Sequence, residues 1–184
     1  MTKLYSYAGI AASIVLIAFG IGATYMGFDG RDRVRDDLAR EMIVGTPDSS
    51  IPGQKVDTGS EAQAFAAVMR KHTLEATGGQ TYAQMGRYLD KQGKPTNDEK
   101  LAAIDAKTGQ PVENGLRNLW VTSTALSTAL NTAYFAESVA TFAIAMGIAL
   151  LLTGLGFLVL TIRLLVPHKA PEKAPVGSAV PAAS

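Results

Sequence analysis

The side chains in this sequence best suited to chemistry are a histidine and a nearby carboxylate. Two histidines occur, His72 and His168, and His72 stands three residues before Glu75, a spacing that places both side chains on one helical face. Such a pair supplies two metal ligands, whereas a zinc or iron site needs three or four, and no third is marked. We therefore expect His72 to pack or to form a hydrogen bond near a helix end.

The absence of cysteine narrows the chemistry further. A chain without cysteine has no disulfide, no thiolate metal ligand and no cysteine nucleophile. The glycine pairs Gly20/Gly22 and Gly154/Gly156 lie inside apolar runs, where a phosphate-binding loop cannot form. The sequence also contains no Ser/His/Asp set, so we predict no catalytic residue, no metal ligand and no cofactor site, and a protein that is not an enzyme.

Glu137 is the acidic residue that most suggests a function, because it stands at the edge of a long apolar stretch. Acids near a membrane can carry protons or bind ligands, but a charge at the headgroup level is tolerated, so we expect an interfacial role. The adjacent pairs Asp36-Asp37 and Asp98-Glu99 do not converge on one substrate, because neighbours on a helix point in different directions. We expect these pairs to be solvated.

Two long uncharged stretches, residues 4–28 and 138–162, dominate the organisation of the chain. Each exceeds the roughly 20 apolar residues that cross a bilayer as a helix. The first lacks the short apolar core and the cleavage site of a signal peptide, so we expect an uncleaved anchor. The predicted parts are a first transmembrane helix (1–28), an insert (29–137), a second transmembrane helix (138–166) and a disordered tail (167–184) rich in proline and alanine.

The positive charges near the termini and those near the insert are nearly equal in number, so they favour neither orientation strongly. Lys3, Arg163 and Lys169 lie beside the termini, while arginines interleaved with aspartates flank the insert. Long loops translocate largely regardless of charge. We therefore expect a multi-pass protein of the plasma membrane with cytoplasmic termini and an extracytoplasmic insert. Expected partners are membrane lipids and other membrane protein subunits; the net charge of +1, without a basic patch, argues against nucleic acid.

The two ends of the insert are predicted to extend the apolar helices. Val34, Leu38 and Met42 recur every four residues, which indicates a continuing helix with an apolar stripe. Residues 118–136 are uncharged but rich in hydroxyls. They could form a third span or the upper half of one helix of about 45–50 residues, roughly 70 Å long. We favour the single helix because no turn separates them from the second stretch, and the two extensions would pair as an antiparallel stalk.

Three shorter helices are predicted between these extensions. The first begins at one of two segments with capping-box spacing, Thr58/Glu61 or Ser60/Gln63. It ends at Gly78-Gly79, and the other two cover residues 81–89 and 97–106. The predicted fold class is an all-α membrane protein, with two transmembrane helices extended into an antiparallel helical stalk and a small helical extracytoplasmic insert.

Small residues four apart recur on both apolar stretches. The pairs are Gly9/Ser13, Ala18/Gly22, Ala23/Gly27, Ala143/Gly147 and Ala145/Ala149. Such seams let helices approach closely in lipid, where no hydrophobic force draws them together. They could join the two helices of this chain or dock onto another protein.

One stretch of the insert resembles a known group of proteins. An alanine-rich helix is followed by a short pattern formed by His72, Thr77, Gly78, Gly79, Thr81, Tyr82 and Ala83. In this pattern the chain resembles small actinobacterial membrane proteins with two spans flanking an extracytoplasmic insert, although the insert here is longer between Leu89 and Arg117. Some members bear an aromatic ring-opening dioxygenase label. That label is not carried over, because such iron chemistry requires converging histidines and a carboxylate.

Two functional hypotheses follow from these features. The first is a non-catalytic accessory or assembly subunit of a larger membrane complex, for example a membrane oxidoreductase. The residues expected to contact its partners are Trp120, Leu126, Leu130, Tyr134, Ala143 and Gly147. The second is an extracytoplasmic ligand-binding or sensory module, anchored by two transmembrane helices, with a pocket near His72, Tyr82 and Trp120.

Overall fold

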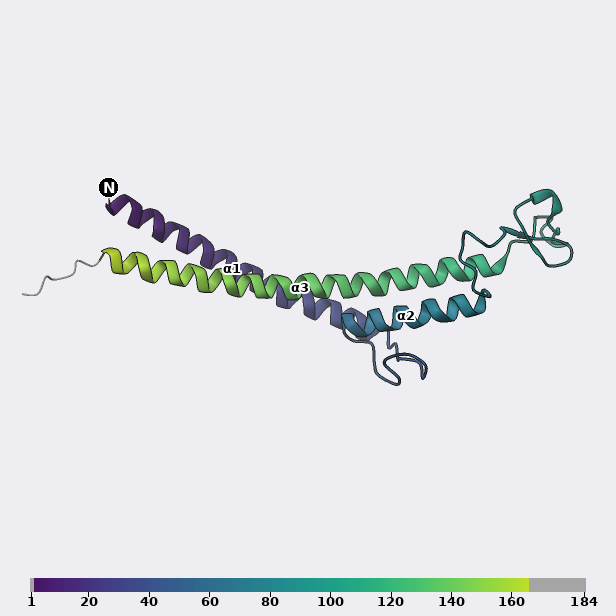
Figure 1. Cartoon of the computed structure of the whole chain (residues 1–184), viewed down its shortest axis with the longest axis horizontal. Helices are drawn as coiled ribbons and strands as arrows, with labels where there is room; N and C mark the ends of the chain where they lie inside the picture. Colours follow the sequence, from purple (N-terminus) through teal and green to yellow (C-terminus); the bar gives the residue numbers. More distant parts are fainter. Residues whose placement is uncertain (1, 166–184) are drawn as a thin grey trace, which may run out of the picture. The chain divides into compact units, whose positions relative to one another are not determined.

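The computed structural model describes residues 2–165 and is mostly helical (Figure 1). These residues form the helices α1 (Thr2–Arg40), α2 (Gly59–Ala76) and α3 (Gly115–Leu165). Between α2 and α3 lie the short strands β1 (Tyr88–Leu89) and β2 (Pro95–Thr96) and the 3₁₀ helix η1 (Glu99–Leu101). The predicted disordered tail, residues 167–184, lies outside the described residues.

Two of the helices, α1 and α3, are long and apolar enough to cross a membrane. α3 continues without interruption for 51 residues. The prediction of one long helix, rather than a separate third span, is therefore confirmed. The described residues divide into two compact units, a first unit of residues 2–22 and 147–165 and a second unit of residues 23–146.

In the first unit, the start of α1 packs on the end of α3 through a seam of small residues. Its buried positions recur every seven residues and are Ser6, Ser13 and Gly20 on α1 and Gly147, Gly154 and Thr161 on α3. The backbones approach so closely that a Cβ atom added at Gly20 would lie 2.8 Å from the carbonyl oxygen of Gly147. The hydroxyls of Ser13 and Thr161 donate hydrogen bonds to carbonyls of their own helices, so neither polar group is buried unsatisfied.

The predicted four-residue spacing describes this seam incompletely. Gly9 and Ser13 do lie against α3, but Ala18, Ala145 and Ala149 are exposed, and a Cβ atom at Gly22 would contact nothing. The observed period is seven because two helices that remain in contact over several turns meet at positions repeating every two turns. The Ala18/Gly22 and Ala145/Ala149 pairs are therefore not part of this seam.

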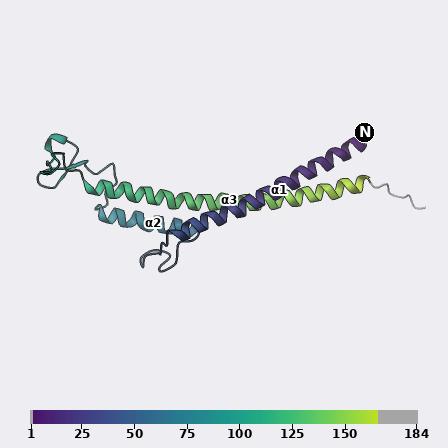
Figure 2. The same cartoon turned by 180° about the vertical axis from the view of Figure 1, so that it is seen from behind.

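In the second unit, α1, α2 and α3 share one hydrophobic core. Its buried members come from all three helices and from the loop before α2: Leu38, Val56, Ala62, Ala66 and Leu130. α2 lies alongside the N-terminal part of α3 in both views (Figure 1, Figure 2). Met42 was predicted to continue the apolar stripe of Val34 and Leu38, and this is wrong. α1 ends at Arg40, and Met42 has a positive φ of 52° and is 84% exposed.

Both ends of α2 follow their local sequence signals. The Thr58 side chain accepts a hydrogen bond from the Glu61 amide, and the Glu61 carboxylate accepts one from the Thr58 amide, which confirms the first of the two predicted capping boxes. At the other end, Gly78 and Gly79 have φ values of 62° and 78°, a conformation that favours glycine.

The prediction of helices at residues 81–89 and 97–106 is wrong. The first segment forms turns and then β1, which pairs antiparallel with β2. The second is helical only at η1, which is capped by Asp98, and its residues Ala102 and Ile104 form isolated β-bridges. The insert is therefore not fully helical.

Two similar turns explain this difference. Asp90 and Asp105 each accept hydrogen bonds from backbone amides two residues or more further on, and Gly93 and Gly109 follow with positive φ. Such Asp turns compete with helix formation because the side chain replaces a helical hydrogen bond. The signal in the sequence was a repeated pattern, with an apolar residue and Asp followed by Gly and then Pro95 or Pro111.

Candidate functional site

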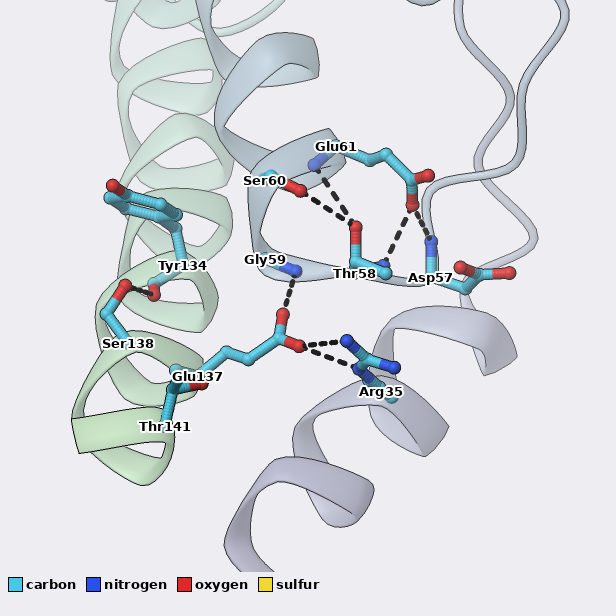
Figure 3. A network of polar contacts seen from close by, with 10 residues as sticks. All are labelled: Arg35, Asp57, Thr58, Gly59, Ser60, Glu61, Tyr134, Glu137, Ser138 and Thr141. Atoms are coloured by element: carbon cyan, nitrogen blue, oxygen red, sulfur yellow. Dashed lines mark hydrogen bonds and ion pairs between the residues drawn. The ribbon is translucent and has the colours of Figure 1, made fainter. Parts of the chain in front are cut away.

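The Glu137 carboxylate on α3 contacts both other helices of the second unit, α1 and α2 (Figure 3). Glu137 is only 9% exposed. Its Oε1 accepts hydrogen bonds from Arg35 on α1, at 2.7 Å from Nε and 2.6 Å from Nη2. Its Oε2 accepts a hydrogen bond from the backbone amide of Gly59, the first residue of α2.

The position of Glu137 follows from the electrostatics of a helix start. The first amides of a helix have no partner within the helix and carry partial positive charge, so a carboxylate there is stabilising. Glycine at position 59 permits this contact because it has no Cβ atom. In any other residue, the Cβ atom would lie 2.8 Å from both the Tyr134 Cα and the Glu137 Oε2, which is too close. Sequence reasoning singled out Glu137 but not its partners Arg35 and Gly59, because they are distant in the chain.

A second polar cluster fastens the loop between α1 and α2 onto α2. The Asp48 Oδ2 lies 2.8 Å from the Lys71 Nζ and 2.9 Å from the His72 Nε2, and its Oδ1 accepts a hydrogen bond from the Thr46 hydroxyl. The hydrogen bond from Lys71, followed by those from His72 and Thr46, holds the pKa of Asp48 well below its usual range. Reciprocally, Asp48 raises the pKa of Lys71. His72 thus has a hydrogen-bonding role in this cluster.

An Asp48→Asn variant is expected to loosen the loop before α2. The pKa of Asp48 is lowered on folding, so its ionised carboxylate stabilises the folded loop at pH values above the ordinary pKa of 3.8. This stabilisation is lost as the pH falls below 3.8. At neutral pH the variant should be cleaved by trypsin after the exposed Lys55 several-fold faster than the parent chain. Asp36→Asn, which removes an exposed carboxylate on α1, is the control. Equal cleavage rates in the two variants would contradict the role of this cluster.

A largely apolar hollow lies against the N-terminal part of α3. Tyr82 and Trp120 line the same hollow together with Val121, Thr124 and Ala125. The structure therefore brings together two of the three residues predicted for a ligand pocket. His72 is not among its lining residues and contacts Asp48 instead.

An apolar groove lies between α1 and α3 in the second unit. It is lined mainly by Val34, Leu38, Ile43, Leu126, Ala129, Leu130, Ala133 and Ala136, with a volume of about 460 Å³. Asp37 and Glu41 border it. Leu126 is 45% exposed at the surface of the groove, whereas Leu130 belongs to the core.

The other residues predicted to contact partners occupy different surroundings. Trp120 is largely buried, and Tyr134 is 37% exposed beside Glu137. Ala143 is half-buried on α3, and Gly147 is buried in the seam of the first unit. Leu126 is thus the member of the predicted set that lines the apolar groove while remaining substantially exposed.

Among residues 2–165, no group of three or more histidine, aspartate or glutamate side chains is arranged to hold a metal ion. The chain matches no protein-family model, no curated protein and no solved structure.

Proposed function

We propose that this chain is a two-pass protein of the plasma membrane, in which α1 and α3 cross the bilayer and continue into water as an antiparallel helical stalk. The length and apolar composition of the two helices support this. Large apolar side chains of the first unit also face outward, with Phe19 69%, Leu152 66% and Leu160 60% exposed. Lipid would cover such a surface. Both termini are proposed to be cytoplasmic and the insert extracytoplasmic.

We further propose that the protein is an accessory or assembly subunit of a larger membrane complex. The observation that carries this proposal is the apolar groove between α1 and α3 of the second unit, which no described residue fills. A helix with an apolar face fits a groove of this kind. Because Glu41 borders the groove beside the Asp37–Arg40 ion pair, the proposed partner helix carries Lys or Arg next to the part of its apolar face that meets Glu41.

A Leu126→Glu variant is expected to lose its partner during purification in mild detergent. The new carboxylate would be buried without a counter-charge against the apolar face of the partner helix, beside two existing acids, and should weaken binding at least about tenfold. Stoichiometry of the purified complex, measured by quantitative mass spectrometry, is the readout.

Leu119→Glu is the matched control for this experiment. Leu119 lies on the same helix and is 43% exposed, close to the 45% of Leu126, but it is not a lining residue of the groove. The control should keep its partners. A parent chain that purifies alone, or two variants that behave identically, would overturn the proposed docking function.

A further inference from the structure

Three neighbouring hollows follow one another along the N-terminal part of α3, and together they are called the groove below. The hollow between α2 and α3 shares Trp120 and Thr124 with the next hollow, and that hollow shares Tyr82 and Val121 with the third. The lining residues on α3 run from Arg117 to Asn131, a distance of about 21 Å at 1.5 Å per residue. The groove therefore suits an extended ligand rather than a compact one.

Three arginines line this groove without a carboxylate partner among the described residues. Arg117 lies 4.0 Å from the centre of the Tyr82 ring, Arg70 lies 5.5 Å from that of Trp120, and Arg87 lies 5.1 Å from that of Tyr88. Glu113 is the one acidic residue in the lining, and none of the three arginines pairs with it within ion-pair distance. On α1, the arginines at positions 33, 35 and 40 are paired with carboxylates, whereas Arg31 stacks alone on Phe28.

The aromatic contacts prepare these arginines to bind an anion. Stacking uses the flat face of the guanidinium group and leaves its in-plane N–H donors free. Those donors match the two oxygens of a carboxylate or the oxygens of a phosphate. A ring that already holds the side chain in place also reduces the conformational entropy lost on binding.

Beside the apolar Ala66, Ala67, Val121 and Ala125, the lining also carries groups that both donate and accept hydrogen bonds. Further along α3 than Trp120 lie three hydroxyls, those of Thr124, Ser127 and Thr128, which make no side-chain hydrogen bond within the described residues. Amides from Gln63, Asn118 and Asn131 extend this set. Hydroxyls and amides of this kind can satisfy the hydroxyl groups of a sugar in either direction.

We propose that this groove binds an acidic saccharide chain, whose carboxylate or phosphate groups pair with Arg70, Arg87 and Arg117 and whose hydroxyls pair with the polar side chains further along α3. A lipid headgroup is a poorer occupant under the membrane placement proposed above, because Arg117 is about 30 Å along α3 from Glu137, at the edge of the apolar stretch. An acidic peptide would supply the charges but not the hydroxyls.

Fluorescence anisotropy of the full chain in detergent micelles tests this proposal. The probes are a labelled oligogalacturonate, a phosphomannan oligosaccharide, a neutral maltooligosaccharide and poly-glutamate. At least one acidic saccharide should bind, and more tightly than both the neutral chain and poly-glutamate. If the oligogalacturonate binds more tightly, the groove prefers carboxylate groups; if the phosphomannan does, it prefers phosphate groups. Arg70→Gln and Arg117→Gln should each weaken that binding about tenfold or more, since each removes a charge-assisted hydrogen bond.

Arg33→Gln is the matched control, because it removes an arginine that is paired with Asp29 and lies outside the groove. It should bind the probe as the parent chain does. Arg117→Lys keeps the charge but loses the forked geometry, so it should bind with intermediate affinity and serves if Arg117→Gln does not fold. Failure of both acidic saccharides to bind, equal binding of poly-glutamate or the neutral chain, or equal losses in Arg33→Gln and Arg117→Gln would each overturn the proposal.

Discussion

A Glu137→Ala variant is expected to destabilise the second unit by about 2–3 kcal/mol. The substitution removes the acceptor for Arg35 and for the first amide of α2, and hydrogen bonds to charged groups contribute about 1.5–3 kcal/mol each. Breaking a fully buried ion pair costs about 3–5 kcal/mol, but the Arg35 side chain is 44% exposed, so water compensates part of the loss. Unfolding in detergent micelles, followed by circular dichroism, measures this change.

Two further variants define the role of Glu137. Glu137→Gln keeps an acceptor for the Gly59 amide but loses the charge, so we expect about half of the loss. Ser138→Ala removes the neighbouring hydroxyl, which donates only to the Tyr134 carbonyl on its own helix, and should stay within about 0.5 kcal/mol of the parent. Hydrogen exchange at the Gly59 amide should increase in Glu137→Ala. A Glu137→Ala chain as stable as Ser138→Ala would show that the three-helix contact contributes nothing.

A Gly20→Ala variant is expected to separate the helices of the first unit, whereas Gly22→Ala should not. A Cβ atom at Gly20 would lie 2.7 Å from the backbone nitrogen of Leu151 and 2.8 Å from the Gly147 carbonyl oxygen, so the backbones must move apart. Overpacking of this kind costs about 1–3 kcal/mol. A Cβ atom at Gly22, two residues along the same helix, would meet nothing within 4 Å. The two substitutions are chemically identical and differ only in the face they occupy.

Disulfide cross-linking measures this separation. The chain has no cysteine, so an introduced pair is the only one present. An ideal Cβ atom at Gly9 lies 3.5 Å from the Thr161 Cβ, within the range of disulfides. Gly9→Cys combined with Thr161→Cys should therefore cross-link under mild oxidation. Adding Gly20→Ala should reduce the yield and adding Gly22→Ala should leave it unchanged; equal yields would contradict the observed seam.

Features that depend on neighbouring residues could be predicted well. The apolar lengths of α1 and α3, the Thr58/Glu61 capping box and the glycine end of α2 all follow from signals within a few residues of one another. Helix length and capping are local properties, because each helical hydrogen bond joins residues four apart. The same reasoning explains why the single long α3 was expected.

The insert between α2 and α3 was predicted less well. The apolar residues of segment 81–89 have helical spacing, yet this segment forms turns and β1. Its backbone hydrogen bonds go instead to distant residues, for example from the Leu89 amide to the Val112 carbonyl. The Asp turns at Asp90 and Asp105 decide the local conformation, and tertiary pairing then overrides the apolar period.

The groups that meet across helices depend on the folded arrangement and not on any local pattern. Residues as distant as Arg35 and Glu137 form one ion pair, and Arg117 reaches the ring of Tyr82 from another element. Many small residues in the sequence could lie at a helix contact, yet in the structure the contact between α1 and α3 in the first unit uses those that recur every seven residues. Local signals establish which helices form, because they act within a turn; contacts between helices select the seam, the ion pair and the groove, because those need close approach of residues far apart in the chain.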